Sequence, residues 1–169
     1  MTGKTHMAVG ASTAWIGAMA AGAAGVELTT GDAALLVALG ALGALLPDLD
    51  APKSRIHNVF KGLTTPIGYI AKHRNFFHSL LAVAIVFGAS WWFGANELVP
   101  GAAFVLAAGY ISHIVIDMLT PAGVRVLFPL KAKLHWLPRK LSPKTGGIVD
   151  NLLFLLASGA TGLFLISMI

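Results

Sequence analysis

Long apolar segments separated by short polar turns make up most of this chain of 169 residues. A run of about 20 apolar residues is long enough to cross the hydrocarbon core of a bilayer as an α-helix. The segments that fit or approach this length are Met7–Val26, Ala33–Leu46, Phe76–Ala95, Leu98–Leu119 and Ile148–Ile169. The pattern therefore predicts an all-α integral membrane bundle of about five transmembrane helices, folded as a single domain over residues 1–169.

The first two segments each leave an alternative open. Met7–Val26 carries a small residue at every fourth position, which would let a second helix pack closely against it. A cleavable signal peptide is the alternative, although cleavage would remove His6. Ala33–Leu46 is short for a span, so either Thr29–Gly31 lengthens the helix or the helix ends in a protein-lined cavity.

The charged residues indicate how the bundle is oriented. With five spans, the N-terminus, Pro47–Asn75 and Ala122–Gly147 fall on one side of the membrane, and that side carries all 12 Lys and Arg residues. By the positive-inside rule this side is cytoplasmic, and the C-terminus is periplasmic or extracellular. The segment around Ile56–Ile70 is predicted to lie on the membrane surface as an amphipathic helix. Trp91 and Trp92 are predicted to anchor the opposite interface.

Composition supports a membrane protein and narrows its chemistry. The chain is 56% hydrophobic and only 11% charged, against about 25% charged residues in a typical soluble domain. It contains no cysteine, which excludes disulfides, thiolate catalysis and cysteine-based zinc sites. Its net charge of +5 is explained by topology next to anionic lipid headgroups, so direct nucleic acid binding is not expected.

A histidine and a carboxylate lie one helical turn apart at the end of the fourth apolar segment. His113 and Asp117 project from one helix face, and Thr120-Pro121 ends the helix directly after them. This spacing suits two metal ligands, or one ligand with its hydrogen-bonded partner. A buried His–Asp pair that only ties helices together is the alternative for such a motif.

Further histidines and carboxylates fall at the same predicted level. The full set at the cytoplasmic ends of the predicted helices is His6, Asp48, Asp50, His73, His78, His113, Asp117 and Asp150. Ionisable groups beside hydrocarbon are costly unless they are paired or bound to a cation. We therefore predict a divalent metal site with one or two ions, with zinc favoured and manganese or iron as alternatives.

These residues receive different roles. The main ligand candidates are His78, His113, Asp117 and Asp48. The residues that either ligate or orient a ligand are His6, His73, Asp50 and Asp150; for His6 an interfacial position is equally open. A two-ion site would suit attack on a phosphate ester, with Arg74 binding the phosphoryl oxygens and Asp50 acting in catalysis. Topology alone is the competing explanation for a basic residue such as Arg74.

The remaining polar candidates are assigned to structure. His57 and His135 lie in basic loops and are predicted to be ordinary surface histidines. Ser79 and Thr120 neighbour ligand candidates but have no triad partner, which makes a serine hydrolase a weak interpretation.

Four motifs follow one another along the chain. They are Thr5-His6, LLPDLDAPKS from Leu45 to Ser54, HRNFFHSLLA from His73 to Ala82, and GYISHIVIDMLTPAGVRVLFP from Gly109 to Pro129. Together they resemble the YdjM-like family of inner-membrane metal-dependent hydrolases. The resemblance implies a helical inner-membrane protein and an association with the repressor LexA. It also implies a metal site formed by His6, Asp48, Asp50, His73, His78, His113 and Asp117.

The chain departs from the pattern of that family at two places. Asn75 and Phe77 replace a glycine and a threonine beside His78, and Asp150 stands where glutamate is common. These changes affect fine geometry but leave the ligand set intact. The order of the motifs is also distantly similar to that in zinc-dependent phospholipases C, which points to phosphoester chemistry.

The leading hypothesis is an inner-membrane hydrolase whose metal site, at the cytoplasmic face, acts on a phosphate ester such as a phospholipid. The expected partners are membrane lipids and a small-molecule or lipid phosphate substrate, and the protein could form a homo-oligomer. An ion or proton translocator is one alternative, but it predicts ionisable groups throughout the membrane depth. A non-catalytic membrane adaptor, whose basic loops bind a protein or anionic lipid, is the other.

Overall fold

The computed structural model describes residues 1–51, 76–138 and 140–169, without the side chain of Asp50. Its α-helices are α1 (Gly3–Ser12), α2 (Ala14–Ala23), α3 (Thr30–Leu45), α6 (Leu80–Trp92), α7 (Ala95–Leu98), α8 (Ala102–Leu119) and α9 (Ile148–Ile166). Two 3-10 helices, η1 (Leu46–Asp50) and η2 (Phe76–His78), follow α3 and precede α6. Within these ranges the β-structure is limited to an isolated bridge between Val124 and Leu134, so the predicted all-α fold is confirmed.

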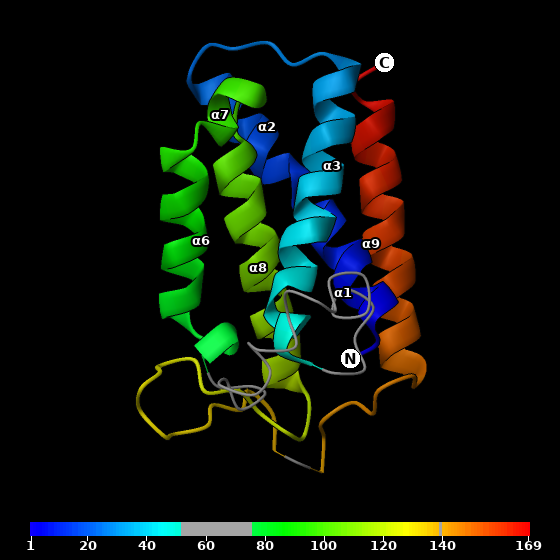
Figure 1. Cartoon of the computed structure of the whole chain (residues 1–169). Helices are drawn as coiled ribbons and strands as arrows, with labels where there is room; N and C mark the ends of the chain where they lie inside the picture. The colour runs from blue at the N-terminus through cyan, green and yellow to red at the C-terminus, as the bar shows by residue number, and fades with distance from the viewer. Residues whose placement is uncertain (52–75, 139) are drawn as a thin grey trace.

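The long helices run side by side along one axis (Figure 1). α8 packs against α1, α2, α3 and α6, while α9 packs mainly against α1. The N-terminus and the connection from α8 to α9 lie at one end of the bundle, which we call the N-terminal end. The C-terminus, the turn between α2 and α3, and α7 lie at the opposite end.

The helices differ in their capacity to span a membrane. Among the described residues, three segments are long and apolar enough to cross: Thr30–Leu49, Ala102–Leu119 and Ile148–Ile166. α6 is apolar but shorter, and the first predicted span is divided into α1 and α2. The count of five spans therefore stays a prediction, and the predicted surface helix around residues 56–70 lies outside the described residues.

Two hydroxyl groups bond to the backbone at the division between α1 and α2. The Thr13 hydroxyl donates to the carbonyl oxygen of Gly10 over 2.6 Å, and the Ser12 hydroxyl donates to that of Val9 over 2.8 Å. Ser and Thr side chains that bond to the preceding turn compete with the backbone ladder and bend helices. The prediction of one continuous helix over Met7–Val26 was wrong, since α1 ends at Ser12 and α2 begins at Ala14.

Identifiable residues set several other helix boundaries. At the end of the bundle opposite the predicted site, Thr29 and Asp32 form a reciprocal capping box, so Thr30 and Gly31 do lengthen α3. Pro47 falls where α3 ends and tightens into η1. Ser79 caps α6 by accepting from the Ala82 N–H, which leaves His78 in the turn before the helix.

Glycines let α1, α3 and α8 touch through their backbones. A Cβ at Gly40 of α3 would collide with the carbonyl oxygen of Gly10 in α1, and a Cβ at Gly109 of α8 would collide with the carbonyl oxygen of Gly40. A Cβ at Gly43 would meet the carbonyl of Leu106 in the same way. Small residues at helix contacts allow this close approach in lipid. The contact fixes the relative positions of the three helices.

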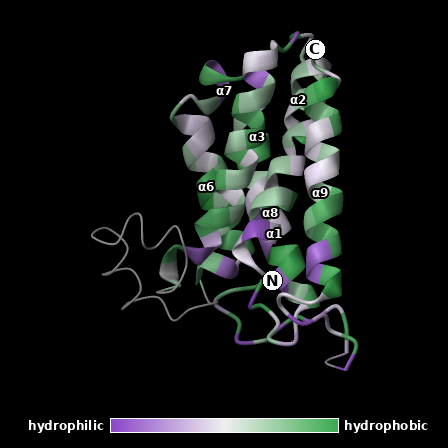
Figure 2. Cartoon of the chain, turned by 90° about the vertical axis from the view of Figure 1, so that its right-hand side faces the viewer, coloured by the Kyte–Doolittle hydropathy of each residue, from purple (hydrophilic) through white to green (hydrophobic). Residues whose placement is uncertain are grey.

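Polar residues gather toward the N-terminal end (Figure 2). The described Lys and Arg residues lie in the first helix or in the connection between α8 and α9; they are Lys4, Arg125, Lys131, Lys133, Lys140 and Lys144. The opposite end carries the exposed Trp91 and Trp92. This distribution agrees with the charge pattern in the sequence, and the assignment of the N-terminal end to the cytoplasm stays a prediction.

The glycine contact can be tested by adding one methyl group. Gly40→Ala is expected to destabilise the bundle by roughly 1–3 kcal/mol, because the added Cβ meets backbone atoms that cannot move aside. Gly159→Ala on α9 is the matched control, since nothing lies within 4 Å of its Cβ. Thermal unfolding in detergent measures the difference between the variants. Equal melting temperatures would show that the close contact is dispensable.

Candidate metal centre

Three imidazoles and two carboxylates meet inside the bundle near its N-terminal end. His6 comes from α1, His113 and Asp117 from α8, Asp48 from η1 and His78 from η2. Both α8 residues, His6 and His78 are at most 2% exposed, whereas the Asp48 side chain is 23% exposed. The structure thus brings these predicted ligands together from separate parts of the chain.

Asp117 lies between the three histidines. Its Oδ1 is 3.4 Å from His6 Nε2, and its Oδ2 is 3.8 Å from His78 Nε2 and 3.9 Å from His113 Nε2. Asp48 Oδ1 lies 3.8 Å from the same His113 nitrogen. Most of these distances are too long for hydrogen bonds, but neighbouring ligands of a tetrahedral ion with bonds near 2.1 Å would lie about 3.4 Å apart. The spacing therefore suits donor atoms that share a cation.

His113 is held with one nitrogen facing this cluster. Its Nδ1 lies 2.7 Å from the carbonyl oxygen of Ala44, and because a carbonyl only accepts, Nδ1 carries the proton. The His113 Nε2 is buried and has no hydrogen-bond partner among the described residues. The ring also stacks on His6, with centroids 3.8 Å apart and planes inclined by 18°. A metal-ligating histidine is commonly oriented by such a backbone carbonyl.

The donor atoms form two overlapping groups, with the atoms of each group within 4.8 Å of one another. One contains His6, His113 and Asp117, and the other contains Asp48, His78 and His113. Because Ala44 engages Nδ1, His113 offers a single nitrogen and cannot ligate two ions separately. Asp117 presents one oxygen to His6 and the other to His78 and His113, so both of its oxygens face imidazole nitrogens.

A cationic group already faces the buried carboxylate. The amino nitrogen of Met1 donates to Asp117 Oδ1 over 3.1 Å, and both groups are almost fully buried. A carboxylate in such surroundings needs compensating positive charge. The Met1 amino group supplies such charge on the Oδ1 side of Asp117, while Oδ2 faces His78 and His113.

Of the two roles considered for Asp150, ligand and orienting residue, its contacts in the structure fit the second. Its carboxylate accepts hydrogen bonds from the Gly146 N–H at 2.6 Å, the Thr2 N–H at 3.1 Å and the Thr2 hydroxyl at 3.4 Å. The Thr5 hydroxyl donates to the Asp150 carbonyl oxygen. Asp150 lies in neither donor group and instead ties the start of α1 to α9. It thereby fixes the helix that carries His6.

Several predicted residues cannot be placed. His73, Arg74 and His57 lie outside the described residues, and so does the side chain of Asp50. Their roles stay predictions. Two hydroxyls near the centre act as caps: Ser79 donates to the Phe76 carbonyl oxygen, and Thr120 donates to that of Asp117.

Sequence reasoning missed the groups that orient the ligands. The Ala44 carbonyl belongs to the backbone, so no side-chain pattern could have indicated it. The contacts of Thr2 and Thr5 with Asp150 were missed as well, because they join segments far apart in the sequence. His135, predicted to be a surface residue, is half-buried and packs against Gly123 in the connection after α8.

Comparison with known proteins defines the family. The model of the YdjM inner membrane protein family matches residues 1–169. The chain belongs to this family. Inner membrane protein YdjM of Escherichia coli (strain K12) is 39% identical over 110 residues, which cover 62% of this chain and 54% of that protein. The Shigella flexneri protein of the same name matches with the same identity and coverage.

A third relative matches along more of its length. The uncharacterized protein YvsG of Bacillus subtilis (strain 168) is 32% identical over 152 residues, which cover 90% of this chain and 86% of that protein. The matched region of the two YdjM relatives amounts to about half of their length. No solved structure matches the chain. Family membership and the apolar helices support a protein of the bacterial inner membrane.

The anchoring role of Asp150 can be separated from a ligand role. Asp150→Ala should weaken metal binding about tenfold, because it frees the start of α1 and so loosens His6 without removing a donor from either group. Ser158→Ala is the control, since Ser158 is an exposed polar residue of the same helix. Titration of purified protein with zinc measures both affinities. Unchanged affinity in Asp150→Ala would contradict the anchoring role.

Proposed function

We propose that this protein is a metal-dependent hydrolase of the membrane that acts on a phosphate ester such as that of a lipid. The main support is the convergence of three buried imidazoles and two carboxylates, from α1, η1, η2 and α8, on one point. Burying so many ionisable groups without a ligand would be costly. The nitrogen and oxygen donor set suits zinc, with manganese or iron as alternatives.

The residues that would hold the metal are His6, His78, His113, Asp48 and Asp117. When bound, a divalent ion supplies a Lewis acid for a phosphoryl oxygen and makes water a nucleophile at neutral pH. The chain's own contribution is orientation. Ala44 fixes the His113 ring, and the contacts of Asp150 with Thr2 fix the helix that carries His6.

Access to the centre would be past Asp48. Its side chain is 23% exposed, whereas the Asp117 side chain is 3% exposed, so we expect a substrate to approach from the Asp48 side. Asp50 lies two residues further along η1, and we assign it a role in catalysis. Arg74 is assigned to the phosphoryl oxygens, because a guanidinium forms paired hydrogen bonds with phosphate. Both assignments follow from the sequence.

The position of the cluster suits a substrate in the bilayer. It lies at the ends of membrane-spanning segments, at the end of the bundle where the described Lys and Arg residues gather. By the positive-inside rule we place it at the cytoplasmic face, at the level of the lipid headgroups. A translocation pathway would need ionisable groups further along the bundle, whereas the donor groups of the described residues lie at one end.

The metal site is tested by single replacements. His113→Ala and Asp117→Ala should each reduce the zinc or manganese retained by purified protein by tenfold or more, because each removes a donor from the cluster. His135→Ala and Glu27→Gln are matched controls, a histidine and a carboxylate outside both donor groups. Elemental analysis of the detergent-purified variants gives the metal content. Equal, negligible metal in wild type and all variants would end the hypothesis.

Hydrolysis is tested separately from binding. Purified protein in detergent should release phosphate or a phosphorylated headgroup from a phospholipid or a generic phosphate ester when zinc or manganese is present. Chelation should abolish the reaction, and His113→Ala should lower its rate by at least about a hundredfold. If the protein binds metal tightly but hydrolyses none of these esters, the metal site stands and the proposed phosphoester hydrolysis is refuted.

A further inference from the structure

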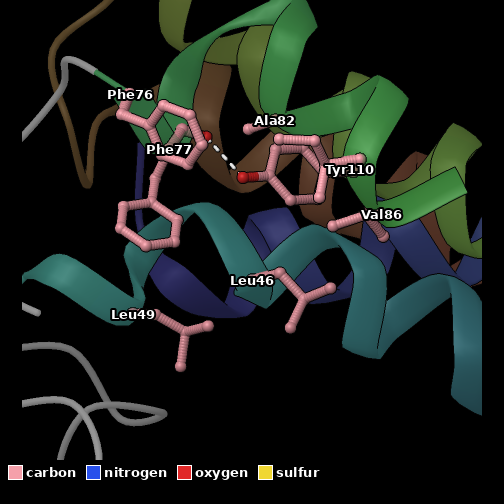
Figure 3. A pocket seen from close by; sticks show the side chains of 8 residues that line it. Leu46, Leu49, Phe76, Phe77, Ala82, Val86 and Tyr110 are labelled. Carbon is pink, nitrogen blue, oxygen red and sulfur yellow. Dashed lines mark hydrogen bonds between the residues drawn. The ribbon is translucent and has the colours of Figure 1, made fainter. Parts of the chain in front are cut away.

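An apolar pocket lies between η1, η2, α6 and α8 (Figure 3). It encloses about 110 Å³ and is lined by Leu46, Leu49, Phe76, Phe77, Ala82, Ile85, Val86 and Tyr110. Tyr110 is the one polar side chain in this lining, and its hydroxyl donates to the Phe77 carbonyl oxygen over 2.6 Å. The lining therefore offers a ligand hydrocarbon contacts and little else.

The pocket adjoins the metal centre through three chain segments. Leu49 directly follows Asp48 in η1, and Phe77 directly precedes His78 in η2. In α8, Tyr110 lies about one helical turn before His113. The same three segments thus carry both candidate metal donors and pocket residues.

The pocket opens toward the surface that the bundle turns to lipid. α6 packs against α8, and Ile85, on the α6 side of the pocket, is 52% exposed. Leu46 and Leu49 line the opposite wall at the end of a membrane-spanning segment, Thr30–Leu49. In a bilayer the molecules available at this opening are lipids.

We propose that this pocket holds part of one alkyl chain of a lipid substrate whose phosphate group reaches the metal centre. The inference rests on the proposed function and narrows its substrate to a lipid phosphate. An apolar cavity of about 150 Å³ binds a molecule the size of benzene, so this smaller pocket takes only a few methylene groups. Because it adjoins the centre, these are the methylenes closest to the headgroup, and the rest of the chain stays in the bilayer.

The energetic basis of this binding is packing. An alkyl chain in a membrane is already in an apolar medium, so entering the pocket gains no hydrophobic transfer energy. It gains dispersion contacts with side chains that would otherwise face a void. Contacts of this kind in membranes are weak, and the discrimination they provide is expected to be about threefold for a single wall residue.

Photolabelling of the full chain tests this proposal without requiring turnover. The protein is placed in phosphatidylcholine nanodiscs with phosphatidic acid that carries a diazirine either near its headgroup or at the end of one acyl chain. Labelling of the pocket segments is measured by mass spectrometry relative to the exposed face of α9. The headgroup-proximal probe should label the pocket preferentially, whereas the terminal probe should label both surfaces alike.

Variants of one wall residue provide the controls. Val86→Phe fills the pocket and should lower the proximal labelling ratio about threefold, whereas Val86→Ala should preserve or raise it. Leu81→Phe adds an aromatic ring to an exposed position of the same helix outside the lining and should have no effect. A fall in both Val86 variants, or equal labelling by the two probes in every variant, would overturn the proposal.

Competition identifies which part of the lipid is recognised. Unlabelled phosphatidic acid should displace the probe, and diacylglycerol or inorganic phosphate alone should displace it much less. Equal displacement by diacylglycerol would show that the phosphate is not recognised and would overturn the proposal. If the wild-type protein retains no metal but its pocket is still labelled, the proposed hydrolase function is refuted, whereas binding of an alkyl chain in the pocket is supported.

Discussion

The backbone contact among α1, α3 and α8 is the constraint on which the rest of the structure depends. Gly10, Gly40 and Gly109 leave no space for a Cβ, so the three helices approach more closely than side chains would allow. This approach brings Ala44 within hydrogen-bonding distance of His113 and stacks His6 on the same ring. Without it, the imidazoles would come from helices too far apart to surround one carboxylate.

This packing surrounds the carboxylate of Asp117 with the histidines of the candidate metal centre. A carboxylate buried in a membrane bundle is tolerated only beside positive charge or bound cations. Here it faces three histidines and the Met1 amino group at distances of 3.1–3.9 Å. The groups that orient these donors, the Ala44 carbonyl and the contacts of Asp150, are themselves buried or tied to a second helix. Orientation by outer groups of this kind is typical of metal sites.

The same short segments carry both candidate metal ligands and residues that line the apolar pocket. η1 carries Asp48 and Leu49, and η2 carries Phe77 and His78, so each turn presents a donor and a hydrocarbon contact side by side. A substrate that is part phosphate and part alkyl chain matches this arrangement. Placing such a site at helix ends would allow hydrolysis at the headgroup without removing the lipid from the bilayer.

The helical membrane fold, the grouping of basic residues at one end and most of the ligand candidates follow from residue patterns, because apolar runs, charges and histidines at helix ends are local features. The pattern of Met7–Val26 did not show that α1 and α2 are separate helices, and the sequence left Asp150 open between a ligand and an orienting residue. The contact of Asp150 with Thr2 joins segments 148 positions apart, so it appears only in the folded chain. Which donors share a point was likewise settled by the packing of the helices, because glycine contacts between helices distant in sequence set those distances.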